Sequence, residues 1–519
     1  MSQRAIRRHA RWFGTCLLMF SVSFLTGCGT DADQNPPVVR VGTGTPLQTF
    51  DPHLADAGPV FSNYLTLVYD GLTRTDSSDF NTPRPNLATD WTWTTPTTIE
   101  LNLREDVTFI DGTPFDAEAA QANLDRMLDS RGPRINTVSS ISHTDILGPY
   151  KIRINLHFPD PTILQNLSGS PGMMVSPTAF DNEDLDINPV GTGPWIYDTE
   201  GSVIGDVHRL SVNPNYHGVD PVELAPFELH VLTDPKARLN ALISGQVDLC
   251  VVGPSEAAPA ADMGYAVAQR ANRWFGMTML DRRGEVVPEF ADVRVRRAIG
   301  YAVDRELLAE VVFFGFARPA SQPMSDVEIG HNPNLRGYYR YDPAKARALL
   351  DEAGVDRVTF TIPVAPSVSA QYEAVQAYLK KVGIDMVIKV IEPGTMGPVA
   401  RSLDYPVNSI GYPNFDPDNR HLAIWDTNAA FNPFRIESPE TDALATEARA
   451  SLDDGLRRRN YEAYFDIVVK DVYSLIYLQV DDLIAYDKDR VDDVRVSRYI
   501  DPMLRELRLK PEHRRPPGV

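Results

Sequence analysis

The stretch GYPNFDPDN, residues 411 to 419, gathers side chains that can hold a small molecule. It contains two aromatic rings, two asparagines and two aspartates within nine positions. Pro413 and Pro417 each lack a backbone donor and favour extended geometry in the preceding residue, so we predict a shaped loop and no regular helix. Aromatic rings stack on peptide planes and sugar faces, which makes this loop a candidate binding element. Asp416 is predicted to cap the turn that follows.

A secreted hydrolase is the alternative from a different class, because ten histidines and 70 acidic residues could supply a carboxylate pair or a nucleophilic triad. The sequence contains no GxSxG, no HExxH and no other local signature of a nucleophile. The glycine pairs in VGTGTP, 41–46, and GTGPW, 191–195, lack the third glycine and the helix of a dinucleotide fold. We therefore expect a binding protein that is not an enzyme and needs no cofactor. Turnover of excess peptide or oligosaccharide separates the two classes, because a binding protein releases no product.

Composition places the chain among globular proteins of several domains or large lobes. It has 519 residues, of which 43% are hydrophobic. With 50 basic and 70 acidic residues the net charge is −20, which argues against a general affinity for nucleic acid or anionic lipid. Of three cysteines only Cys250 lies in the body of the chain, so no internal disulfide is expected. No cysteine and histidine cluster indicates a metal site, and none is predicted.

The N-terminus carries signals for export and anchoring. Four arginines without an acidic residue precede the apolar run FGTCLLMFSVSFL, 13–25, which is short for a membrane span and typical of a secretory signal. The overlapping LTGC, 25–28, resembles the bacterial lipoprotein box, in which the cysteine is lipidated and becomes the first residue. This predicts a signal peptide at 1–27, a lipid on Cys28 and a polar tether at 28–37. An ordinary cysteine at position 28 stays open as the alternative.

The rest of the chain alternates strands and helices. VVRVGT, 38–43, and TIELNLREDVTF, 98–109, have the β-branched content or the two-residue period of strands. Three helices are predicted to begin at the capping aspartates Asp116, Asp234 and Asp342. The second and third of them are predicted to end at Gly245 and Gly354. The helix after Asp234 leads directly into an apolar strand, which is typical of α/β architecture with mostly buried sheets.

A further helical stretch, VRVRRAIGYAVDRELL from 293 to 308, places its apolar residues on one face. Four arginines lie largely off that face, namely Arg294, Arg296, Arg297 and Arg305. We predict that they form a solvated, ion-paired surface, and a binding patch for an acidic partner is the alternative.

Together these segments resemble the solute-binding proteins of bacterial ABC importers, family 5, which include oligopeptide-, dipeptide- and nickel-binding proteins. The resemblance covers about residues 38 to 505. It rests on the order and spacing of TFDPH (49–53), VYDGLTR (68–74), LREDVTFIDGTPFDAEAA (103–120), NPVGTGPW (188–195), DPKARLNALISGQVDL (234–249), FADVRVRRAIGYAVDRELL (290–308) and LKKVGIDM (379–386). It implies a monomer, held outside the cytoplasm by its lipid, that delivers a small solute to a membrane permease with ATPase subunits.

The fold that the resemblance implies is α/β and periplasmic-binding-protein-like, of type II, cluster C, with two lobes joined by a hinge. Lobe I is expected at 38–70, 186–272 and 478–519, with an extra subdomain at 71–185, and lobe II is expected at 273–477. Two chain crossings between lobes suit a hinge, because a few residues can absorb the closure. Solute would then be enclosed between the lobes.

The resemblance also bears on the identity of the solute. Dipeptide and oligopeptide binders carry an acid three places before the DP pair of the loop, for the peptide amine, whereas this chain has Pro413 there. The arginine that dipeptide binders use for the carboxylate has no counterpart in IPVAPSVSAQY, 362–372. An unpaired terminus in a closed cleft would cost several kcal/mol, so a zwitterionic dipeptide is disfavoured. The arginine that nickel-binding members use to hold the metal chelate is also absent, because Ser168, Gly169 and Ser170 stand at the corresponding positions.

A longer or capped peptide, or a peptide-like solute, is therefore expected, with an oligosaccharide or a metal chelate such as nickel as alternatives. The resemblance places six residues at the cleft, namely Leu47 and Gln48 from lobe I and Trp274, Tyr412, Asn414 and Trp425 from lobe II. Aromatic side chains suit this role because they supply large contact area at low entropic cost. Core packing is the alternative for each aromatic.

Overall fold

The computed structural model describes residues 37 to 514, apart from 48, 56–58, 131, 133, 219–222, 327, 393–394, 410, 412–415 and 498–501. Cys28, Gln48, Tyr412 and Asn414 therefore lie outside the described residues. Among the helices that are described, none combines the length and the apolar character needed to cross a membrane.

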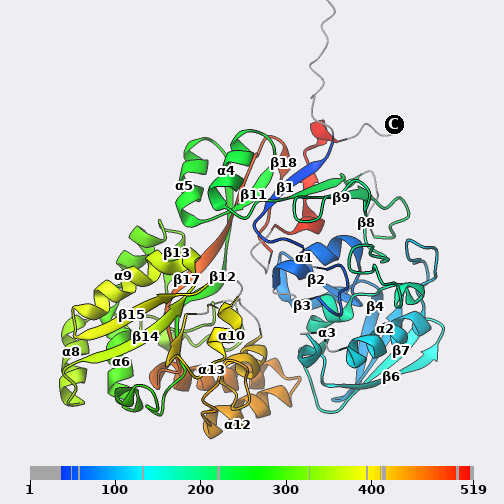
Figure 1. Cartoon of the computed structure of the whole chain (residues 1–519). Coiled ribbons are helices and arrows are strands. Elements are labelled where there is room, and N and C mark those ends of the chain that lie inside the picture. Colours follow the sequence, from blue (N-terminus) through cyan, green and yellow to red (C-terminus); the bar gives the residue numbers. More distant parts are fainter. Residues whose placement is uncertain are drawn as a thin grey trace, which may run out of the picture. The chain divides into compact units, whose positions relative to one another are not determined.

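A nine-stranded mixed sheet is the central element of the fold (Figure 1). Its strands in spatial order are β16 (Val407–Asn408), β12 (Ala266–Met279), β17 (Ser474–Tyr486), β11 (Leu249–Val252), β1 (Val39–Thr43), β10 (Phe227–Val231), β9 (Val207–Val212) and β8 (Trp195–Tyr197), with β13 (Ala317–Pro319) beside β17. β1 pairs in parallel with β10 and β11, whereas β17 is antiparallel to both β11 and β12. The strand predicted at 38–43 is thus confirmed as β1.

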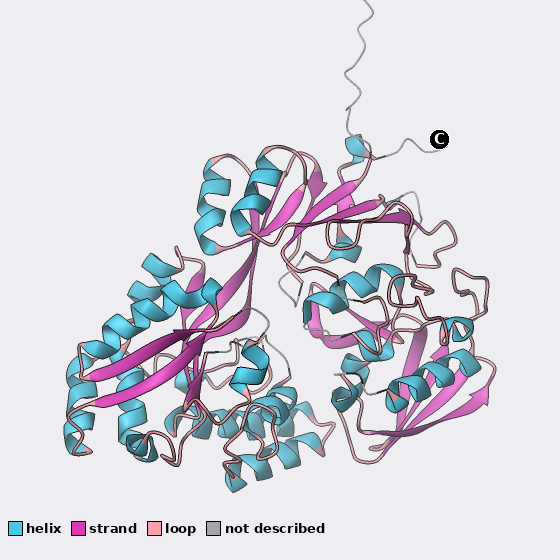
Figure 2. Ribbon diagram, viewed as in Figure 1, coloured by secondary structure: helices cyan, strands magenta, loops and turns pink. Residues whose placement is uncertain are grey.

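Two long strands connect two separate hydrophobic cores. β12 pairs with β17 from Ala266, opposite Tyr486, to a point well inside the other core. The register shifts between Ala271 and Arg273, and such a bulge bends a strand. Figure 2 shows both strands as long ribbons that run from one part of the sheet to the other. The bulge therefore lies where the chain passes from one core to the next.

The buried apolar side chains form distinct clusters along the sequence. The largest lies within residues 274 to 480, and another lies within 72 to 174. A further cluster joins side chains from 39–69, 173–229 and 484–509. Because each cluster has its own interior, the parts can keep their internal packing when the segments between them bend.

The residues between 72 and 174 build a four-stranded antiparallel sheet covered by one helix. Its strands in spatial order are β4 (Ala88–Thr95), β5 (Thr98–Leu103), β7 (Lys151–Leu156) and β6 (Ile141–Gly148), and α2 (Ala117–Asp129) packs on it. The period-two strand predicted at 98–109 is confirmed over 98–103 as β5, with Ile99 and Leu101 buried on one face, and residues 104–109 leave the sheet. A separate hairpin of β2 (Thr73–Asp76) and β3 (Asp79–Pro85), with the short helix α3 (Ile163–Asn166) packed on it, belongs to the same stretch of chain.

The largest core holds the parallel pair β14 (Val358–Val364) and β15 (Ile384–Val390) and most of the helices. These helices are α6 (Val293–Ala302), α7 (Arg305–Leu307), α8 (Pro343–Glu352), α9 (Ser369–Lys380), α10 (Met396–Ala400), α11 (Pro417–Arg420), α12 (Pro439–Arg449) and α13 (Asp454–Lys470). Outside this core lie α1 (Pro59–Val68), α4 (Pro235–Ile243), α5 (Pro254–Asp262) and the small pair β18 (Val491–Asp492) and β19 (Arg508–Leu509).

The predicted capping aspartates are confirmed at the starts of α2, α4 and α8. Asp116, Asp234 and Asp342 each accept a hydrogen bond from the backbone N–H three residues further on. Each cap satisfies one of the donors that the first helical turn leaves unpaired. Gly245 and Gly354 have φ angles of +73° and +70°, the left-handed conformation that ends a helix at low cost for glycine.

The prediction of a solvated arginine surface after residue 293 is wrong for two of the four side chains. Arg296 and Arg305 are buried and donate to backbone carbonyl oxygens. Arg294 and Arg297 lie nearer the surface and pair with aspartates, as predicted. The helix α6 ends at Ala302, so the helical period that placed Arg305 on the outer face does not extend to it.

Candidate solute-binding site

The loop 411–419 is held at both ends. A side-chain carbon on Gly411 would lie 2.6 Å from the carbonyl oxygen of Trp274, so glycine lets the loop approach β12 closely. Asp416 accepts a hydrogen bond at 3.0 Å from the backbone N–H two residues on, which confirms its predicted capping role. Arg457 of α13 donates to Asp416 at 2.7 Å, and neither side chain is more than 10% exposed. The loop is thereby fixed to a strand and to a helix of the largest core.

The helix that follows the loop is anchored by a second buried carboxylate. Asp418 accepts two hydrogen bonds from Arg449 of α12, at 2.8 and 2.9 Å, and one from the Tyr461 hydroxyl of α13 at 3.1 Å. Burial alone would lower the pKa of Arg449, but its pairing with Asp418 raises that pKa overall. The bidentate geometry also fixes the orientation of the helix. The helix α11 that follows the loop is therefore firmly anchored to α12 and α13.

The structure places Trp425 and Trp274 inside the largest core. Trp425 has no exposed surface, packs against Tyr464 and Phe465, and donates from Nε1 to the Ser474 hydroxyl at 3.1 Å. Trp274 is 1% exposed and belongs to the same cluster. These contacts match the core-packing alternative that the sequence left open for both residues. Neither indole lines the cavity described below.

Outside the largest core, Leu47 is partly buried and packs against the core that contains β1. The segment after it carries TFDPH, in which Asp51 accepts two hydrogen bonds from Arg126 of α2, at 3.0 and 2.6 Å. Burial favours a raised pKa for Asp51, but Arg126 and nearby donors hold it below its ordinary value. This motif therefore fastens the β1 segment to the subdomain and does not present a free carboxylate.

His53 completes the same network as a neutral imidazole. Arg126 donates to its Nδ1 at 2.8 Å, so the ring proton lies on Nε2, which donates to the Met173 carbonyl at 3.2 Å. Burial, followed by the Arg126 charge, lowers the pKa of His53 to about 4. A protonated ring would turn a second N–H toward the Arg126 donor. His53 is thus a structural residue at neutral pH.

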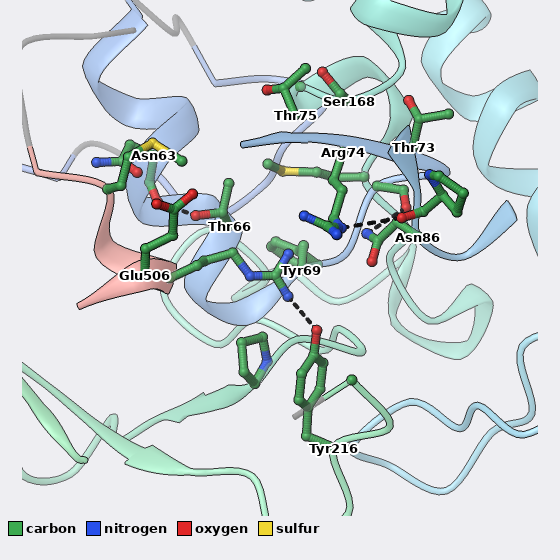
Figure 3. A pocket seen from close by; sticks show the side chains of 18 of the residues that line it. Asn63, Thr66, Tyr69, Thr73, Arg74, Thr75, Asn86, Ser168, Tyr216 and Glu506 are labelled. Atoms are coloured by element: carbon green, nitrogen blue, oxygen red, sulfur yellow. Dashed lines mark hydrogen bonds between the residues drawn. The ribbon is translucent and has the colours of Figure 1, made fainter. Parts of the chain in front are cut away.

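A cavity of about 740 Å³ opens beside α1 and the β2–β3 hairpin (Figure 3). Its walls also include the segment 194–195, Tyr216 with its neighbours, and the C-terminal segment 503–508. Ser168 and Gly169 form part of the wall. This volume lies within the usual range of small-molecule sites. All of its described lining lies outside the core of residues 274–480.

A buried ion pair forms one wall of this cavity. Arg505 donates to Asp70 at 2.6 Å. It also donates to the Tyr216 hydroxyl at 2.7 Å, the hydrogen bond that Figure 3 draws at Tyr216. Asp70 is fully buried and also accepts hydrogen bonds from Asn86 at 3.3 Å and Thr192 at 3.1 Å. Burial alone would lower the pKa of Arg505, but Tyr216 and Asp70 raise it overall. This guanidinium is therefore committed to holding the wall together.

In the described part of the chain, two other arginines of the cavity lack a close ion-pair partner. Arg74 is exposed and donates to the Pro85 carbonyl oxygen at 3.2 Å. Within the described residues Arg508 donates to backbone carbonyl oxygens at 2.8 and 2.9 Å, and the charges of Glu223 and Glu506 act on it from further away. Neither forms an ion pair with any carboxylate that the structure describes. Guanidinium groups in this state can receive a carboxylate or a carbonyl of a bound molecule. Glu506, the acid of the lining, already accepts hydrogen bonds from Ser77 at 3.0 and 2.5 Å.

Local sequence patterns did not single out these cavity residues. Asp70 and Arg74 lie within VYDGLTR, but nothing in that stretch distinguishes a wall from scaffold. Arg505 and Arg508 lie more than 400 residues further on, so only the folded chain brings them to the same cavity.

Comparisons with known proteins agree with this architecture. NikA from Brucella suis, solved in complex with Fe(III)-EDTA, has a TM-score of 0.80 at 25% identity, covering 91% of this chain and 100% of that one. DppA from Helicobacter pylori, a periplasmic binding protein solved with the peptide STSA, has a TM-score of 0.77 at 22% identity, covering 91% and 98%. The chain thus has the two-lobed α/β fold of periplasmic binding proteins, as predicted.

The glutathione-binding protein GsiB of Salmonella paratyphi A is 30% identical over 269 residues, which is 50% of each chain. The chain spans about half the length of the first curated relatives that it matches. Residues 82–432 match the family described as bacterial extracellular solute-binding proteins, family 5 Middle. The chain therefore belongs to the bacterial extracellular solute-binding proteins of family 5.

Proposed function

We propose that this chain is the solute-binding component of an ABC importer and captures a peptide or peptide-like solute between its two lobes. The proposal rests on the family match over residues 82–432, because the matched residues include most of the apolar cluster within 72–174 and most of the largest core. Bending at the β12–β17 bulge would close the lobes on solute and exclude water. The closed monomer would then dock on a membrane permease whose ATPase subunits drive release.

Several observations support a peptide-like solute. The related GsiB is named for glutathione, and the DppA structure contains a tetrapeptide. Arg74 and Arg508 offer guanidinium groups to carboxylates or carbonyls. Ser168 and Gly169, at the approach that the family resemblance links to solute, line the same cavity, which supports assigning it to the first-lobe half of the solute site. The NikA neighbour, solved with Fe(III)-EDTA, keeps a metal chelate as the alternative.

Isothermal titration calorimetry of the purified chain tests the solute class. We expect glutathione or a tetrapeptide to bind with a Kd of about 1–10 µM, because a longer peptide is also held through its backbone. A zwitterionic dipeptide should bind more weakly than about 1 mM, because Pro413 and the base-free segment 362–372 lack the acid and the base that dipeptide binders set against its two termini. Micromolar binding of a dipeptide would contradict this expectation. If no peptide binds but a nickel–histidine complex or an oligosaccharide does, the solute belongs to that class instead. Product in excess of one equivalent would indicate an enzyme.

The same titration on two tyrosine variants tests the loop 411–419. Tyr412→Ala should weaken peptide binding by about tenfold or more without changing the unfolding midpoint, because a ring that stacks on solute supplies much of the contact energy. Tyr341→Ala is the matched control, since Tyr341 is an exposed tyrosine that packs edge-on against Tyr378, away from the loop. Equal affinities for both variants would remove the loop from the site.

We further propose that a lipid on Cys28 anchors the protein to the outer side of the cell membrane, with 28–37 as the tether. The order of basic head, short apolar run and LTGC supports this step. Cells that express the wild-type chain with labelled palmitate should yield a labelled protein, and a Cys28→Ser variant should yield none. Label retained by the Cys28→Ser variant would rule out this anchor.

A further inference from the structure

Three side chains at the edge of the largest core form a cluster whose geometry suits a metal ion, with the histidine buried and the two aspartates 28% and 31% exposed. His421 begins the π-helical turn η9 (His421–Trp425), Asp426 follows that turn, and Asp442 lies in the first turn of α12. His421 Nε2 lies 3.5 Å from Asp426 Oδ2 and 3.8 Å from Asp442 Oδ1. Two ligand atoms each about 2.1 Å from one tetrahedral ion lie roughly 3.4 Å apart, so small side-chain rotations would bring these atoms into coordination.

His421 is oriented as a metal-binding histidine would be. Its side chain is only 3% exposed, and its Nδ1 shares a hydrogen bond of 3.1 Å with the Tyr464 hydroxyl. When Nδ1–H donates to that oxygen, the lone pair of the ring lies on Nε2. Nε2 points at the two carboxylates and makes no hydrogen bond with any residue that the structure describes. A fixed outer hydrogen bond with a free inner nitrogen is the usual arrangement of a liganding imidazole.

Asp442 supplies a second unsatisfied atom on the same cluster. Its Oδ1 is buried and accepts no hydrogen bond from the described part of the chain. The Ser438 backbone N–H and the Thr427 side chain act on this carboxylate as donors, while the negative charges of Asp426 and Glu437 repel it. A buried oxygen without a donor, beside like charges, is costly unless a cation lies between them.

Nearby arginines do not supply that cation. Arg449, on the same helix as Asp442, gives both of its hydrogen bonds to Asp418. Arg282 lies 4.0 Å above the ring of Tyr473 and donates to the Met279 carbonyl oxygen at 3.2 Å. The positive charge in this region is therefore already committed to other partners.

We propose that His421, Asp426 and Asp442 bind a divalent cation, with zinc as the ion that this nitrogen and oxygen set favours. Imidazole together with carboxylates suits zinc better than calcium or magnesium, which prefer oxygen ligands alone. The ion would join η9 to α12, which lies beside α13 in Figure 1, and so lock the base on which the loop 411–419 stands. The site is distinct from the first-lobe cavity and does not depend on which solute is captured.

Calorimetric titration of the untagged chain with zinc, after dialysis against EDTA and without solute, tests the proposal. We expect one equivalent of zinc to bind with a Kd of about 10 µM or tighter and to raise the unfolding midpoint by several degrees, while magnesium at the same concentration does neither. Cobalt should bind in the same place and give the visible absorption of a low-symmetry site. No saturable zinc binding below about 100 µM would overturn the proposal.

Two variants and a matched pair locate the ion. Asp442→Asn and His421→Gln should each lower zinc affinity by about 30-fold or more. The metal-free Asp442→Asn protein should be as stable as the metal-free wild type, because it loses a repelled charge. His143 and Asp145 are the control, since their Nε2–Oδ1 distance is also 3.8 Å but both side chains are exposed. His143→Gln with Asp145→Asn should leave zinc binding unchanged, and unchanged binding in Asp442→Asn would overturn the assignment.

Discussion

Trp425→Ala should lower the free energy of unfolding by about 3–5 kcal/mol, the range for removing a fully buried aromatic ring. Trp425 has no exposed surface, and its ring fills the space beside Tyr464 and Phe465. Truncation would leave a cavity lined by those rings and would leave the Ser474 hydroxyl without its indole donor. Urea unfolding followed by circular dichroism measures the change.

A residue on the surface provides the comparison for Trp425. Phe158 is 43% exposed, so Phe158→Ala should change the free energy of unfolding by less than about 1 kcal/mol. The opposite result for Trp425→Ala, unchanged stability with at least tenfold weaker solute binding, is what a ring in the cleft would give. That outcome would contradict the core position and return Trp425 to the solute site.

Arg305→Met should destabilise the largest core by about 3 kcal/mol or more. The guanidinium of Arg305 donates to carbonyl oxygens of Gly300, Ala320, Tyr339 and Ile476 at distances from 2.9 to 3.3 Å. These carbonyls belong to four separate segments, and methionine would leave them without this donor. Burial lowers the pKa of Arg305 to about 10, so the side chain stays charged at neutral pH. The midpoint of urea unfolding is the measurement.

Two further variants separate this effect from a simple loss of charge. Arg305→Lys keeps the charge but cannot reproduce the planar fork of donors, so it should also be destabilising. Arg294→Met removes an exposed arginine that pairs with Asp292, and it should cost less than about 1 kcal/mol. Equal stability of Arg305→Met and Arg294→Met would show that the buried hydrogen bonds contribute little.

Much of the fold could be predicted because its signals are local. Asp116, Asp234 and Asp342 indicate where helices begin, because a carboxylate just before a helical run can accept hydrogen bonds from the free N–H groups of the first turn. Gly245 and Gly354 mark helix ends for the equally local reason that glycine tolerates positive φ. The ordered series of motifs from TFDPH to LKKVGIDM indicated the family and therefore the two-lobed architecture.

The site was less predictable, because burial and long-range pairing decide what each side chain does. Trp425 was expected at the cleft, with core packing as the alternative, and Arg305 on a solvated helix face, yet the packing of other segments encloses both. Asp416 has one predictable and one unpredictable role. Its capping hydrogen bond is local, whereas its ion pair with Arg457 requires α13 to pack against the loop.

The sequence by itself determined the family, through the order and spacing of motifs along the chain. It also determined the α/β class and the helix boundaries at the capping aspartates, which depend on neighbours within a few positions. Only the tertiary structure decided that Arg74, Arg505 and Arg508 share one cavity, and that His421, Asp426 and Asp442 meet. The physical reason is that these groups meet through contacts between separate helices, strands and loops, some of them hundreds of residues apart. No local period or spacing encodes such contacts, because they form when buried apolar faces bring their elements together.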